Sequence, residues 1–237
     1  MCDDGLMGQV AVLERRIYAM SDVDLYLGLP TGTARRWIDG YQRGSEAYPP
    51  VIRPERSGME SVTWGEFVET SLLAEYRSRG VSLQRLRPAV QQLRKEFATP
   101  YPLASAAPYL DVAGRELVRQ VQDATGVDRA LHLVVVRSGQ LVLAEPAQAF
   151  ADRAEFAGRG RTVSGLRTET DTPDVRIDPL RQTGQPVVRS VPTAVLAEGF
   201  RAGTSVPDLA ELYDLEPDQV IQAIRYEMRA SQARVSA

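Results

Sequence analysis

The stretch from Tyr18 to Gly40 constrains the fold most, because it carries the start and stop signals of two short helices with a tight turn between them. Ser21 and Asp24 have the spacing of a capping box, and Gly28 is a natural helix end. Thr31 can cap the helix that follows. The sequence therefore predicts a helix-turn-helix unit near the amino terminus.

The second of these helices has an apolar face and a basic face. Ala34, Trp37 and Ile38 recur at helical spacing, which predicts that they are buried and that Arg35 and Arg36 lie outside. The amino-terminal amides of such a helix favour phosphate, and its outer side chains can reach base edges in a major groove. The residues of this unit that we expect to contact DNA are Thr31, Thr33, Arg35 and Arg36.

Two short β-prone segments follow, Val51 to Arg53 and Val62 to Trp64, on either side of a tip rich in Pro, Gly and Ser. This pattern predicts a wing, a β-hairpin beside the recognition helix. Arg53 and Arg56 would lie at its tip, where they could contact the sugar-phosphate backbone.

The next segment is helical and strongly basic. Thr63 and Glu66 form another capping box, which opens a helix that runs to Gly80. Between Arg77 and Lys95 there are five arginines, one lysine and no acid. This window predicts either a solvated face or a docking surface for acidic neighbours.

The first hundred residues resemble the winged helix-turn-helix of MerR-like and excisionase-like proteins. The resemblance rests on the helix pair from Ser21 to Gly40, the wing and the helices after it. It implies a DNA-binding domain at residues 1–98 in which Thr33, Arg35 and Arg36 touch DNA and Trp37 is core. The long coiled-coil helix and ligand domain of the usual MerR activator are absent from the sequence.

The middle of the chain, residues 99–178, is predicted to be a small α+β connector. It begins with a Pro/Ala-rich stretch, and it contains two β-rich runs on either side of Ser138 and Gly139, which is a hairpin signal. A further strand is expected after Gly165, and His132 is expected to be a packing residue. Such a connector could dimerise or pack against a neighbouring domain.

The last part, residues 179–237, is predicted to hold three helices that also have helix-turn-helix form. Its charge is unsuited to DNA, because five acids and no basic residue lie between Ser205 and Asp218. Carboxylates at the start of a recognition helix repel phosphate. We therefore expect this trihelical domain to face another protein.

The segment from Ile177 to Met228 resembles the small antitoxin domain that is encoded beside PIN-like ribonuclease toxins. The matching elements are Gly184-x-Pro186, Gly203-Thr204-Ser205, Leu209-Ala210, Tyr213-x-Leu215, Gln219-Val220 and Ala223-Ile224-x-Tyr226. The family usually has Gly-Thr-Arg where this sequence has Arg189-Ser190-Val191. With the amino-terminal module included, the whole chain resembles a large VapB-type antitoxin.

This resemblance implies a toxin that is an RNase with clustered, Mg²⁺-binding carboxylates, and an antitoxin that blocks that pocket. A guanidinium can pair with these carboxylates and compete with the metal. The alternative is that each arginine is simply exposed to solvent near the end of its helix, where the helix dipole favours a cation. The other route is steric occlusion of the pocket, either by the corner at Tyr213 and Leu215 or by the central domain. The residues expected to bind the toxin are Tyr213, Leu215, Arg225, Arg229 and Arg234.

Composition excludes several other functions. Cys2 and His132 are the only cysteine and histidine, so the sequence can form neither an intramolecular disulfide nor a Cys/His zinc site. The net charge of -3 excludes a uniformly basic nucleic-acid coat. No nucleophile-base pair or phosphate loop is legible, so we expect neither an enzyme nor a cofactor. Without a signal peptide or membrane-spanning run, we expect a cytosolic protein.

The sequence as a whole predicts an α+β, mainly helical protein with a winged helix-turn-helix, a connector and a trihelical domain. Its predicted function is that of an antitoxin that neutralises a PIN-like ribonuclease toxin and binds promoter DNA to regulate its own expression. We expect a homodimer or a larger toxin-antitoxin assembly. The alternative is a stand-alone MerR-like transcriptional regulator whose central domain senses a ligand.

Overall fold

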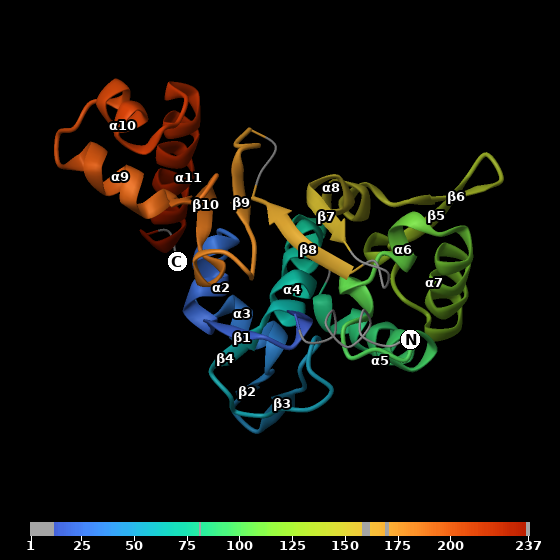
Figure 1. Ribbon diagram of the computed structural model, residues 1–237. Helices are drawn as coiled ribbons and strands as arrows, with labels where there is room; N and C mark the ends of the chain where they lie inside the picture. The colour runs from blue at the N-terminus through green and yellow to red at the C-terminus, as the bar shows by residue number, and fades with distance from the viewer. Residues whose placement is uncertain (1–11, 81, 158–161, 169–170, 236–237) are drawn as a thin grey trace, which may run out of the picture.

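The computed structural model describes residues 12–80, 82–157, 162–168 and 171–235. Its helices and antiparallel strands surround α4 (Trp64–Tyr76), which lies in the middle of the view in Figure 1 and is buried along nearly its whole length. Thr63 caps α4 as predicted, because its hydroxyl accepts from the Glu66 amide while the Glu66 carboxylate accepts from the Thr63 amide. The predicted capping box at this position is confirmed.

The predicted helix-turn-helix unit is present. The chain enters it through β1 and continues into two helices: β1 (Arg16–Ala19), α2 (Met20–Tyr26) and α3 (Thr33–Ile38). The predicted capping box of Ser21 and Asp24 is wrong, since α2 begins earlier, and it is the Asp22 carboxylate that accepts a 2.8 Å hydrogen bond from the Ala19 amide. Gly28 has a φ of 59° and ends the helix turn as expected.

The wing differs from its prediction in position. The hairpin beside α3 is formed by β2 (Tyr41–Arg43) and β3 (Glu46–Tyr48). Residues 51–53 form a bend, because their amides donate to the carbonyls of Trp37 and Ile38 at 2.9, 3.1 and 3.2 Å and are therefore unavailable to a strand partner. The other predicted wing strand is β4 (Ser61–Thr63), which pairs with β1.

The basic window lies in short helical segments and α5 (Arg87–Glu96). Three of its arginines point at acids elsewhere in the chain: Arg79 at Glu145 (3.0 Å), Arg85 at Asp128 (3.1 Å) and Arg94 at Glu69 (3.9 Å). At these positions the window docks against acidic neighbours within the protein, which is one of the two predicted alternatives.

The middle of the chain adds three helices and the predicted hairpin. The hairpin extends away from the helices in Figure 1, and Ser138 and Gly139 form its turn with φ values of 49° and 76°. His132 is a packing residue whose Nε2 lies 3.1 Å from the Val127 carbonyl. The elements are α6 (Ala107–Leu110), α7 (Val112–Thr125), β5 (Val134–Arg137), β6 (Gln140–Leu143) and α8 (Glu145–Arg153).

One hydrophobic core joins this middle region to the helix-turn-helix unit, since a single cluster of buried side chains extends from Leu13 to Ile177. Trp64 makes a polar link within it, because its indole N–H donates to the Val163 carbonyl at 2.8 Å. The two regions thus pack as one body around α4.

The three predicted helices of the carboxyl-terminal region are present, but the region also contains strands, so the prediction of a trihelical domain is not confirmed. Two of its strands complete a five-stranded antiparallel sheet in the order β11-β10-β9-β8-β7. The strand expected after Gly165 corresponds to β9 in this sheet. The elements are β7 (Ala154–Ala157), β8 (Thr162–Arg167), β9 (Val175–Ile177), β10 (Pro186–Val188), β11 (Val191–Pro192), α9 (Thr193–Arg201), α10 (Val206–Tyr213) and α11 (Pro217–Val235).

A second, smaller core holds α9, α10 and α11 against β9 and β10. The last helix also touches the helix-turn-helix unit, because the Tyr226 hydroxyl donates to the Tyr26 carbonyl at the end of α2 at 3.1 Å. Gly184 fits closely here as well, since a Cβ at this position would lie 2.3 Å from the Tyr18 hydroxyl oxygen. Among the described residues, no helix has the length and apolar character needed to cross a bilayer.

Candidate nucleic-acid interface

The outer face of α3 presents two arginines. Arg35 and Arg36 are exposed, whereas Ala34 and Ile38 are fully buried, as the helical spacing predicts. Thr33, which the sequence predicts to lie near the edge of this face and to contact DNA, is only 4% exposed. Its hydroxyl instead accepts a 3.0 Å hydrogen bond from Arg36 Nη2 and so helps to orient that guanidinium.

The backbone amides at the amino terminus of α3 already donate hydrogen bonds to a side chain of the same protein. Asp24 is buried, and its carboxylate accepts from the amides of Gly32 (2.6 Å) and Ala34 (2.7 Å). Burial raises the pKa of Asp24, although the two amides oppose that shift. Thr31 is exposed but does not cap the helix, because Gly32 is the N-cap residue. These two amides are therefore unavailable to a phosphate, contrary to the expectation from the sequence.

Arg53 is also placed differently from its prediction at an exposed tip. It is 5% exposed, and it lies between two buried carboxylates, at 2.9 Å from Asp39 and 2.7 Å from Glu66. Arg56 lies outside on the same loop, with 60% of its side chain exposed. Of the two predicted wing-tip arginines, only Arg56 is accessible to a ligand.

The buried ion pairs of Arg53 pin the loop of residues 54–60. Asp39 accepts hydrogen bonds from the amides of Ser57 (2.8 Å) and Gly58 (2.9 Å). Burial opposes ionisation of Asp39, but the hydrogen bonds from Ser57, Arg53 and Gly58 outweigh it and lower the pKa of the carboxyl. Arg53 itself donates to the carbonyls of Met59 (2.9 Å) and Ser61 (2.8 Å).

The wing is the β2–β3 hairpin. Gly40, with a φ of 74°, makes the sharp turn from α3 into β2, and a Cβ there would lie 2.5 Å from the Tyr48 carbonyl oxygen. The rings of Tyr41 and Tyr48 stack across the two strands at 4.6 Å. Arg43 is exposed next to the turn and adds a cation that the sequence analysis missed. The dipeptide Gly44-Ser45 between two tyrosine-bearing runs was the signal that could have identified this hairpin.

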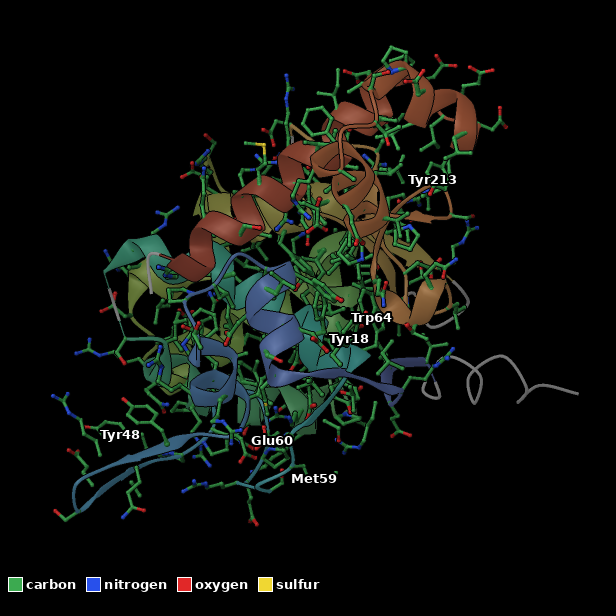
Figure 2. The ribbon with its side chains drawn as sticks, turned by 90° about the vertical axis from the view of Figure 1, so that its left-hand side faces the viewer. Tyr18, Tyr48, Met59, Glu60, Trp64 and Tyr213 are labelled. Carbon is green, nitrogen blue, oxygen red and sulfur yellow. The ribbon has the colours of Figure 1, made fainter. Side chains whose placement is uncertain are left out.

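Figure 2 shows Tyr48 of the wing and Met59 and Glu60 of the pinned loop on the same lower side of the molecule. Glu60 reaches α3, where its carboxylate forms an ion pair with Arg35. The Arg35 guanidinium holds the pKa of the Glu60 carboxyl below its usual value. The wing, the loop and the outer face of α3 therefore form one continuous surface.

The residues predicted to bind a toxin lie elsewhere, and Figure 2 shows Tyr213 at the opposite end of the molecule from Tyr48. Leu215 is only 8% exposed and belongs to the second core, so it is not available as a surface contact. Tyr213 packs partly against the same core.

The three predicted arginines lie on α11. Arg225 is exposed, whereas Arg229 donates to both carboxylate oxygens of Asp171 at 2.7 and 2.8 Å. Arg234 is in the last turn of α11, and its side chain lies outside the described part of the chain. Arg225 and Arg229 therefore differ in their freedom to meet a partner.

The amino-terminal region, which carries the surface formed by the wing, the loop of residues 54–60 and α3, matches a known family model. Residues 16–90 match the model described as "Putative DNA-binding HTH domain", which spans β1, both helices of the unit, the wing and α4. The chain thus contains a helix-turn-helix DNA-binding domain.

Full-length relatives come from Mycobacterium tuberculosis. "Uncharacterized protein Rv2308" is 37% identical over 98% of both chains. "Putative antitoxin VapB45" is 29% identical over 88% of this chain and 92% of the relative. The X-ray crystal structure of Rv2018 superposes with a TM-score of 0.72 at 28% identity and covers 90% of this chain and 99% of that one. The similarity therefore extends across all the regions described above.

Proposed function

The chain belongs to the family of Rv2308 of Mycobacterium tuberculosis, and we propose that it is an antitoxin of a type II toxin-antitoxin module. It binds the promoter DNA of its own gene through the amino-terminal unit, and it binds and neutralises a PIN-like ribonuclease toxin through the carboxyl-terminal region. Support for the antitoxin role comes from the relative named VapB45, which matches nearly the whole chain.

One observation carries the DNA-binding part of the proposal: Arg35 and Arg36 are exposed side by side on α3, next to an exposed wing. A short helix of this kind can enter a major groove while the wing and Arg56 contact the backbone. As a homodimer the protein would present two such helices to the two halves of a palindromic site.

The proposed toxin surface is the acidic corner, which we define as Asp208, Glu211, Asp214, Glu216 and Asp218, together with the exposed Arg225 on α11. All five acids are exposed, and Leu212 among them is 68% exposed. This corner lies far from the wing, so both partners could be bound at once.

The test of the DNA role is a gel-shift titration of the full chain on the segment upstream of its gene. The double variant Arg35→Ala/Arg36→Ala should lose affinity, and the slope of log affinity against log salt should shrink by about 0.9 for each lost phosphate contact. Arg137→Ala is a matched control, because Arg137 is an exposed arginine on the distant β5–β6 hairpin. Unchanged binding by the folded double variant would place the DNA site elsewhere.

The toxin role is tested by co-purifying the full chain with the product of an adjacent PIN-like reading frame and measuring RNA cleavage. A stable complex with inhibited cleavage is the expected result. Failure to form a complex would favour the alternative, a regulator that senses a ligand. In that case the cleft of about 720 Å³ between α2, α4 and α8 is the place to look for the ligand.

A further inference from the structure

The two arginines on the outer face of α3 have different surroundings. Arg35 forms an ion pair with Glu60, whereas Arg36 donates to the neutral hydroxyl of Thr33. Both members of the Arg35–Glu60 pair are accessible, with 46% and 64% of their side chains exposed. Exposed ion pairs of this kind contribute little to folding stability. The pair therefore needs an explanation other than stability.

Glu60 is held in place although its side chain is exposed. The carbonyls of its two neighbours, Met59 and Ser61, both accept hydrogen bonds from the buried Arg53. Ser57 and Gly58 earlier in the loop are bonded to Asp39. The backbone on both sides of Glu60 is thus fixed relative to α3, which carries Arg35.

A fixed carboxylate next to Arg35 has two consequences for a DNA ligand. It repels the phosphate backbone, because like charges at short distance oppose each other. It also holds the planar guanidinium in one orientation, so that the remaining N–H groups are presented to a ligand in a defined direction. In a major groove, the neutral edge that accepts two such N–H groups is the O6 and N7 side of guanine.

We propose that Glu60 is a specificity-determining positioning residue: it directs Arg35 to a guanine edge in the major groove and away from phosphate, which is left to Arg36. This inference rests on the proposed DNA-binding function and assigns different tasks to two neighbouring arginines. It also gives the buried Arg53 network a role at the interface, because that network sets the position of Glu60.

The experiment uses the full chain and duplexes that the wild-type protein selects from a pool with a randomised central segment. Each selected guanine is replaced by 7-deazaguanine, which lacks the N7 acceptor, and affinity is measured over a range of salt. For the wild type, one such replacement in each half-site should weaken binding by about 5- to 150-fold. An unrelated duplex gives the non-specific affinity.

Glu60→Gln keeps the size of the side chain and removes its charge. We expect this variant to bind the unrelated duplex several-fold more tightly, with a salt slope steeper by up to about 0.9. The penalty for 7-deazaguanine should fall to a few-fold or less. Glu55→Gln is the matched control, because Glu55 is an exposed acid on the same loop for which the described residues provide no ion pair. It should leave the penalty unchanged.

A double-mutant cycle then tests whether Glu60 acts through Arg35. In an Arg35→Gln background, Glu60→Gln should no longer change the 7-deazaguanine penalty, whereas in an Arg36→Gln background it should still do so. If Glu60→Gln retains the wild-type penalty and salt slope, the inference is overturned while DNA binding stands. If the wild type binds no duplex, the proposed function and this inference both fail.

Discussion

The α2–α3 unit and the α9–α11 unit both place a turn between two packed helices, but they differ in whether their acidic side chains are buried or exposed. In the amino-terminal unit, Asp24 and Asp39 are 7% and 2% exposed, and both accept hydrogen bonds from backbone amides. In the carboxyl-terminal unit, the five acids of the acidic corner all face solvent. Similar helical spacing thus leaves exposed arginines on α3 at one end of the protein and exposed acids on the helices at the other.

This difference teaches that the number of charged residues in a helix pair is a poor guide to its partner. What matters is which charges the local hydrogen bonding removes from the surface. Asp24 ties α3 to α2, and Asp39 ties the loop of residues 54–60 to the end of α3, so the exposed charges on α3 itself are Arg35 and Arg36.

The largest effect is expected from Arg53→Met, because it leaves Asp39 and Glu66 buried without their cation. Removing one partner from a buried ion pair costs about 3–5 kcal/mol of folding free energy. Urea denaturation followed by tryptophan fluorescence measures this loss. Arg56→Met is the matched control and should cost about 0.5 kcal/mol or less, since that side chain is exposed. Equal stabilities for the two variants would contradict the buried role of Arg53.

The next largest effect concerns the carboxyl-terminal core. Leu215→Ala should destabilise the protein by about 2–4 kcal/mol, because Leu215 is buried in the second core. Leu212→Ala should leave stability nearly unchanged, because Leu212 is 68% exposed. The same denaturation curves decide the matter. If Leu215→Ala is as stable as wild type, Leu215 has the accessible position that the sequence predicted for it.

A smaller effect comes from an acid that is buried without sufficient compensation. Burial raises the pKa of Glu69 in α4 to about 7, although Arg94 opposes that shift. The folded state then holds a proton that the unfolded state releases, so the contribution of Glu69 to stability is largest below about pH 4.5 and declines as the pH rises to about 7.

Glu69→Gln should therefore raise stability above pH 7 by about 1–3 kcal/mol and flatten the profile between these limits. Denaturation midpoints at several pH values provide the measurement. A wild-type stability that rises between pH 5 and pH 7 by the same amount in both proteins would show that Glu69 is ionised in the folded state.

The smallest effect is expected at the proposed toxin surface. Arg225→Glu should weaken binding of the toxin by about tenfold, which corresponds to about 1.4 kcal/mol, and should leave DNA affinity unchanged. Arg229→Glu is a less specific test of toxin binding, because it would also break the ion pair between Arg229 and Asp171. Titration of the toxin by calorimetry provides the affinity. An unchanged affinity for Arg225→Glu would remove this residue from the proposed surface.

Much of the fold could be predicted from local signals in the sequence. The Thr63 and Glu66 capping box, the Ser138-Gly139 turn and the alternation of Ala34 and Ile38 with arginines each depend on residues close together in the chain. Such signals locate helices and hairpins well, because neighbours in sequence supply both partners of the contact.

These local signals could not predict contacts between residues that lie far apart in the sequence. Arg53 was read as a surface cation because its partners, Asp39 and Glu66, lie fourteen and thirteen residues away. Likewise, the bend at residues 51–53 depends on carbonyls at the end of α3. The pairing of Glu60 with Arg35 depends on a loop whose path is set by the same buried arginine.

If the two helical units serve different partners because their exposed charges differ, DNA binding depends on α3 and not on the acidic corner. The most direct test is the salt dependence of DNA binding by the full chain, measured for Arg36→Gln and for Asp208→Asn/Glu211→Gln. Arg36→Gln is expected to weaken binding and to reduce the salt slope by about 0.9, whereas the acidic-corner variant should leave both unchanged. If Arg36→Gln keeps the salt slope of the wild type and the acidic-corner variant alters it, DNA binds at the carboxyl-terminal unit instead.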